Sequence, residues 1–148
     1  MPETVTGLPA GYRTTSAKVM RILTMATGTL AVVQFALAGY GAFSSVNKQD
    51  KWGAHETLGN IIGILTILVL MAALVSRPGR RPLIGAIVLC VVAAPLQPIL
   101  AQLGKDHGTW WGAVHALGGI VILGMCGLVS RKINTAAPST EPAEPTPA

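Results

Sequence analysis

Charged residues are scarce in this sequence. Only 11% of its 148 residues are Asp, Glu, Lys or Arg, whereas a soluble domain carries about a quarter. The deficit is concentrated in four windows that contain no charged residue: 22–43, 57–76, 83–101 and 111–130. Each window is long enough to cross a hydrocarbon core of about 30 Å as a helix. The scarcity of charge therefore excludes an ordinary soluble domain.

Cysteine and the usual motifs of soluble enzymes are also scarce. The two cysteines, Cys90 and Cys126, both fall inside charge-free windows, so they are expected to be small apolar side chains and not a secreted-type disulfide framework. The sequence has no nucleophile elbow, phosphate-binding loop or cysteine-based metal spacing. No window carries the acidic or broken-helix features that transport sites use, which disfavours a small transporter. Whether the chain is an enzyme stays open.

The windows predict an all-α protein, a transmembrane four-helix bundle, because lipid offers the backbone no other hydrogen-bond partners. The predicted domain covers residues 20–132. It follows a flexible cytoplasmic segment, 1–19, and precedes a disordered cytoplasmic tail, 133–148, that is rich in Pro, Ala, Thr and Glu. The first window starts too late and is too long for a signal-peptide core, so we expect it to be retained.

Lysine and arginine predict the orientation of the bundle. The N-terminal segment, the loop after the second window and the segment after the fourth carry eight of them: Arg13, Lys18, Arg21, Arg77, Arg80, Arg81, Arg131 and Lys132. The opposite side carries three: Lys48, Lys51 and Lys105. The positive-inside rule then puts both termini in the cytoplasm of a bacterial plasma membrane. This asymmetry explains the net charge of +5, so we expect a lipid bilayer and no nucleic acid as partner.

The chain also contains a two-fold internal repeat. Three pairs of phrases recur in the same order: "QFALAGYG" and "QPILAQLG", "WGAHETLGN" and "WGAVHALGG", "LVSRP" and "LVSRK". Residues 20–78 and 83–132 are therefore predicted to be two copies of one helical hairpin, related by an axis along the membrane normal. Pro95 and Pro98 predict a kink near the outer end of the third helix.

Two of the three histidines open the second and fourth helices. His115 lies about four residues inside a charge-free window, where an ionisable side chain is a functional hypothesis by default. Gly59 and Gly119 each follow a histidine by four residues, so each imidazole stands above a strip with little side chain. A flat macrocycle would fit between two such strips. The sequence thus predicts haem b, with His55 and His115 as its iron ligands.

Simpler explanations of the same residues stay open. The glycines would also serve close helix packing. His115 could be hydrogen-bonded to Gln34 or Gln97, and His55 could be a partly hydrated interfacial side chain. The two glutamines need polar partners, either the edge of a ligand or a structural bond within the bundle. The third histidine, His107, is expected to be solvated in the outer loop.

One spacing counts against a shared metal. The segment from His55 to Arg77 is longer than the segment from His115 to Arg131. If both arginines mark the same level, the imidazoles differ in depth by about 9 Å, at about 1.5 Å per residue. Helix tilt absorbs part of this difference.

Taken in order, "QFALAGYG", "HETLGNIIG", "PLQPILAQLG" and "HALGG" resemble a family of small four-span, largely actinobacterial membrane proteins of unknown function. The pattern covers about residues 20–132 and also resembles one four-helix half of haem A synthase. In that enzyme, histidines open the second and fourth helices of each half and can hold haem, which implies His55 and His115 as ligands here. The synthase has eight spans and a Glu before the second-helix His. Here Ala54 precedes His55, so synthase activity does not carry over.

Two classes of function follow from these features. The first is a small cytochrome-like protein that binds haem b and transfers electrons near the outer face of the membrane, with quinone as a natural partner. The second is a cofactor-free accessory or assembly subunit of a larger membrane complex. Small size, short outer loops and small-residue faces support the second class.

Overall fold

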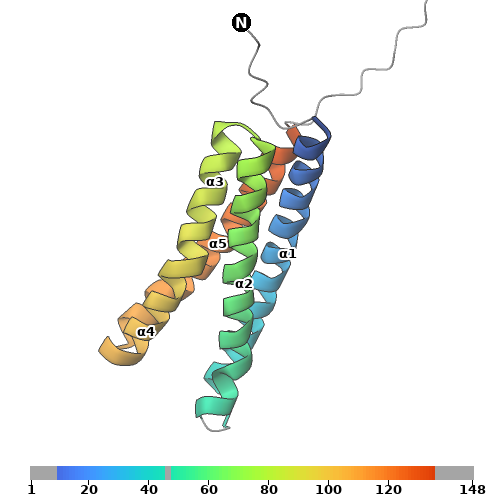
Figure 1. The fold of residues 1–148 in the computed structure, drawn as a ribbon. Coiled ribbons are helices and arrows are strands. Elements are labelled where there is room, and N and C mark those ends of the chain that lie inside the picture. Colours follow the sequence, from blue (N-terminus) through green and yellow to red (C-terminus); the bar gives the residue numbers. More distant parts are fainter. Residues whose placement is uncertain (1–9, 46–47, 136–148) are drawn as a thin grey trace, which may run out of the picture.

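The computed structural model describes residues 10–45 and 48–135, and this part of the chain contains helices and no strand (Figure 1). The helices are α1 (Ala10–Phe43), α2 (Lys48–Ser76), α3 (Arg80–Val91), the π-helical turn η1 (Val92–Leu96), α4 (Gln97–His107) and α5 (Thr109–Thr135). Because α3, η1 and α4 run on without a break, the described residues form four helices long and apolar enough to cross a membrane. The predicted all-α four-helix fold is confirmed.

The helices extend beyond the predicted windows at both ends of the chain. α1 begins at Ala10, so the described part of the predicted flexible segment 1–19 is helical. The reason is packing: Ser16 and Ala17 are partly buried, and this first stretch of α1 lies beside the end of α2. α5 continues to Thr135. The remainder of the predicted tail, 136–148, lies outside the described residues.

The bundle is built from two hairpins. α1 packs along α2, and α5 packs along α3 and α4; the hairpins meet where α1 contacts α5 and α2 contacts α3 and η1. The shared core consists mainly of small and medium side chains, including Ala31, Ala73, Ala86, Val69, Val129 and Cys126. Many large apolar side chains, such as Ile64 and Leu128, point outward instead. Small residues inside and large apolar residues outside are typical of helices that associate in lipid.

Hydroxyl groups in the core are paired within their own helices. Thr24 Oγ1 donates to Met20 O at 2.7 Å, and Thr27 Oγ1 donates to Leu23 O at 2.8 Å. Such bonds satisfy buried hydroxyls without a partner from another helix. The polar side chains of the core therefore do not determine how the hairpins dock.

The third span is irregular at the position where the two prolines predict a kink. Pro95 lies inside the π-turn η1, and Pro98 lies in the first turn of α4. A proline has no N–H to donate and crowds the preceding turn, and a π-turn accommodates this by widening the helix. Beyond η1, α4 lies against α5 and leans away from α2 (Figure 1). The two hairpins therefore part towards the end opposite the α2–α3 loop (Figure 1).

Candidate functional site

A cavity of about 1040 Å³ lies between the two hairpins, in the half of the bundle opposite the α2–α3 loop. Its walls are mainly alanine and glycine, which leave space where larger side chains would meet: Ala31, Ala38, Ala42, Gly59, Ala93, Ala101, Gly104, Gly112, Ala116 and Gly119. All six residues that the sequence nominated line this one cavity: Gln34, His55, Gly59, Gln97, His115 and Gly119. The fold thus brings the predicted site residues together, from four different spans.

The imidazoles of His55 and His115 both line the cavity and lie close together in an edge-on arrangement. Their ring centroids lie 6.1 Å apart, and the ring planes are inclined at 64°. The depth difference expected from the arginines is therefore not observed. The reason is that Arg131 does not mark the end of its helix: α2 ends at Ser76, just before Arg77, whereas α5 continues past Arg131 to Thr135. Measured to the helix ends, the two histidines stand at nearly the same level.

Each histidine is held by the preceding helix of its own hairpin. His55 Nδ1 lies 3.3 Å from Gln34 O, and His115 Nδ1 lies 3.1 Å from Gln97 O. A carbonyl oxygen only accepts, so both bonds require the proton on Nδ1. Nε2 is then the unprotonated nitrogen of each ring and can bind a metal or accept a proton. The repeat in the sequence is therefore a repeat of one hydrogen-bonded unit.

The glutamine side chains are only partly satisfied. Gln34 Nε2 donates to His55 O at 2.8 Å, which fixes the orientation of that amide. Gln34 Oε1 and Gln97 Oε1 are buried, and neither has a hydrogen-bond partner among the described residues. A buried acceptor without a partner is costly unless water or a ligand supplies a donor. Each hairpin therefore contains one buried acceptor without a partner among the described residues.

The glycines near the histidines make room for the glutamine amides. A Cβ on Gly59 would lie 3.2 Å from Gln34 Nε2, and a Cβ on Gly118 would lie 3.0 Å from Gln97 Nε2. Both contacts are tighter than ordinary van der Waals distance. The expected strip of free space beneath each histidine is thus occupied by an amide, and the open volume lies beside it, between the hairpins.

Two aromatic side chains of the cavity were not among the predicted site residues. Trp52, which was not assigned to the site from the sequence, lines the cavity and packs edge-on against His55 with ring centroids 5.6 Å apart. Its ring also covers Gly41, where a Cβ would lie 2.7 Å from Trp52 Cε3. The spacing of three residues between Trp52 and His55 was the available signal. Phe35 lies opposite Gly119, and no pattern in the sequence indicated that contact.

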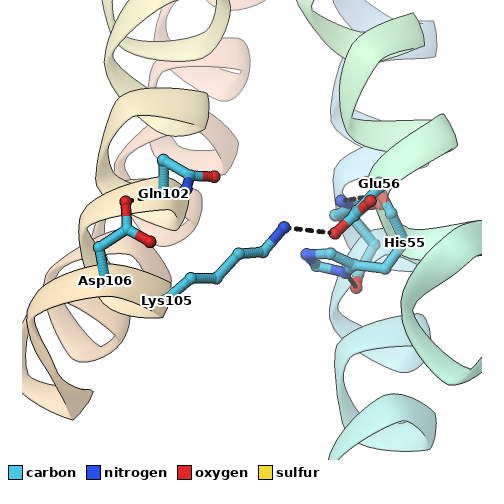
Figure 2. Close-up of polar contacts among 6 residues, drawn as sticks. His55, Glu56, Gln102, Lys105 and Asp106 are labelled. Carbon is cyan, nitrogen blue, oxygen red and sulfur yellow. Dashed lines mark hydrogen bonds and ion pairs between the residues drawn. The ribbon is translucent and has the colours of Figure 1, made fainter. Parts of the chain in front are cut away.

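An ion pair spans the mouth of the cavity. Lys105 Nζ on α4 lies 2.7 Å from Glu56 Oε1 on α2, and Figure 2 shows the lysine reaching across the gap between the helices to the carboxylate beside His55. Within the described part of the chain, these are the only Lys, Arg, Asp or Glu side chains that line the cavity. His107, by contrast, is exposed at the end of α4 and does not line it.

Fold and site together define a small four-span membrane protein with a cavity between two repeated hairpins. Residues 34–105, which are 72 of the 148, match the model of a family of unknown function (DUF6220). The match includes His55 and ends before α5 and His115. No curated protein and no solved structure matches the chain. The match agrees with the resemblance to an uncharacterised family, and the likeness to half of haem A synthase stays a prediction.

Proposed function

We propose that this chain binds haem b between its two hairpins, and that Nε2 of His55 and Nε2 of His115 would hold its iron. One observation carries the proposal: the two rings lie 6.1 Å apart, each with its Nδ1 directed at a backbone carbonyl. Two imidazoles that bind one metal from opposite sides, through bonds of about 2 Å, have ring centroids about 6 Å apart. The spacing matches that of two ligands on a single ion.

The surrounding residues fit such a group. Haem iron takes neutral imidazole ligands, and metal-bound histidines usually donate their other N–H to a carbonyl or carboxylate. The volume of about 1040 Å³ lies just above the range of about 300–1,000 Å³ that is typical of ligand sites. A flat, mainly apolar ligand would be surrounded by alanine, glycine and Phe35.

The chain itself would supply orientation and exclusion of water. The carbonyls of Gln34 and Gln97 hold both imidazoles in the Nδ1–H form, and Trp52 packs against one side of His55. When bound, haem b supplies one-electron transfer. A quinone or a larger membrane complex would be the natural partner in a bacterial plasma membrane.

The proposal includes an orientation for the bundle. Eight of the eleven lysines and arginines lie on the side of the termini and of the α2–α3 loop. With that side in the cytoplasm, the cavity opens towards the outer face. Electron transfer would then take place near the outer leaflet.

Absorption spectroscopy of the purified protein tests the proposal. Alanine variants of the three histidines can be compared, two at the proposed site and one outside it. Protein from haem-replete cells should show a Soret band that shifts on reduction. His55→Ala and His115→Ala should each lose or strongly weaken the band, because one ligand is removed. His107→Ala should keep it, since His107 is exposed and outside the cavity.

Two outcomes would contradict haem ligation by this pair. One is a band that survives in both His55→Ala and His115→Ala. The other is colourless protein from haem-replete cells, which would favour the cofactor-free accessory or assembly subunit.

A further inference from the structure

The two hairpins differ in charge where the repeat makes them equivalent. Aligning Gln34 of α1 with Gln97 of α4 pairs Ala42 with Lys105, because each lies eight residues further along the chain. Both Ala42 and Lys105 line the cavity. A cation thus stands on one hairpin at a position where the other carries a methyl group.

The same asymmetry occurs one residue after each histidine. Aligning His55 with His115 pairs Glu56 of α2 with Ala116 of α5, and again both line the cavity. The side of the cavity between α2 and α4 therefore carries an ion pair, whereas the repeat-related side between α1 and α5 carries two alanines.

The lysine is available to a ligand. Its side chain is 58% exposed, and that of Glu56 is 54% exposed. Exposed ion pairs contribute little net stability, because both charges remain solvated and the long side chains lose freedom. The ammonium group of a lysine is a point charge on a flexible stem, so it can exchange one carboxylate for another without moving the backbone. The ammonium group lies beside His55 at the cavity mouth, where it contacts Glu56 (Figure 2).

We infer that Lys105 binds a carboxylate of the cavity ligand and thereby fixes which way round the ligand lies. The inference rests on the proposed function, under which that carboxylate is a propionate of haem b. Both hairpins offer the ligand one imidazole and one glutamine side chain, whereas only one hairpin offers a cation. A carboxylate beside the alanines would lack a charged partner, and a carboxylate beside Lys105 gains a charge-assisted hydrogen bond.

Affinity for two porphyrins tests this assignment on the full chain in detergent. Haem b and its dimethyl ester share the iron and the ring, but the ester has no carboxylate. Absorption titration of Lys105→Ala should show weaker binding of haem b, by up to about tenfold, because the lost contact with Glu56 offsets part of the gain from one charge-assisted hydrogen bond. Binding of the dimethyl ester should not change.

The repeat supplies a rescue variant. In Lys105→Ala combined with Ala42→Lys, the cation moves to the equivalent position on the other hairpin. The affinity of this double variant for haem b should return most of the way to that of the unmodified chain, because the ligand can bind the other way round. Glu56→Gln should not weaken haem b binding, because it removes only the competing carboxylate.

Each failure has a distinct meaning. If Lys105→Ala weakens both porphyrins equally or neither, or if Glu56→Gln weakens haem b as much as Lys105→Ala, the role of Lys105 is overturned while histidine-dependent haem binding stands. If the unmodified chain binds neither porphyrin, the proposed function and this inference fall together.

Discussion

The close approach of α4 and α5 rests on two glycines that respond differently to the same substitution. A Cβ on Gly104 would lie 3.0 Å from Gly112 N and 3.2 Å from Gly112 Cα. Backbone atoms cannot rotate out of the way, so Gly104→Ala forces the two helices apart by a few tenths of an ångström. A Cβ on Gly112 would meet nothing within 4 Å, so Gly112→Ala fits without movement.

The size of the steric cost to stability follows from comparing Gly104→Ala with Gly112→Ala. Overpacking of a close contact costs about 1–3 kcal/mol. Replacing glycine by alanine inside a helix stabilises the helix by up to about 1 kcal/mol, and this gain is common to both variants. The difference between them isolates the steric cost. Gly104→Ala should therefore be less stable than Gly112→Ala by about 1–3 kcal/mol.

Unfolding in mixed detergent micelles, followed by circular dichroism as the fraction of denaturing detergent rises, measures this difference. Gly112 lies three residues before His115, so separation of α4 from α5 should also displace that imidazole and weaken porphyrin binding. Equal unfolding free energies for the two alanine variants would refute the close α4–α5 contact and the position of His115 that depends on it.

Two further comparisons probe the walls of the cavity by the same unfolding measurement. Gln34→Met should lower the free energy of unfolding by about 1 kcal/mol, because it removes the hydrogen bond from Nε2 to His55 O. Gln97→Met should lower it by less, because it removes an amide whose Oε1 is buried and unpaired. A larger loss of stability in Gln97→Met than in Gln34→Met would contradict the hydrogen bonding described for the two amides. Trp52→Ala should lower the free energy of unfolding by about 2 kcal/mol and weaken porphyrin binding, because it removes the ring that packs on His55. The side chain of Trp110 is 75% exposed, so Trp110→Ala should change the free energy of unfolding by less than about 0.5 kcal/mol. Equal effects of the two tryptophan variants would show that Trp52 is only an interfacial anchor.

Most of the fold could be predicted from the distribution of charge. A helix that crosses a bilayer must be long and uncharged, and the segments that connect two such helices carry charged residues or proline. The four uncharged windows therefore predict four membrane-spanning helices. The repeat then predicted the two hairpins and the grouping of the histidines and glutamines. The irregular turn in the third span followed from Pro95 and Pro98.

The details that failed or were missed depend on where helices end and on contacts between hairpins. Arg131 was taken as the level of the membrane edge, but α5 continues to Thr135, and this removes the apparent offset between the histidines. The contact of Lys105 with Glu56 joins residues 49 apart in sequence, on helices from different hairpins. No periodicity within one helix contains that information.

The hydrogen-bonded unit explains why a repeat suits this cavity. The bond between a histidine and the preceding glutamine spans only 21 residues in the first hairpin and 18 in the second. Each hairpin therefore orients its own imidazole through a local contact, before the other hairpin is needed. A single hairpin offers one nitrogen, and only the docking of α1 on α5 and of α2 on α3 brings two together. Under the proposed function, duplication of one hairpin would provide both histidine ligands of the site. A charge present in only one copy would then determine which way round the ligand binds.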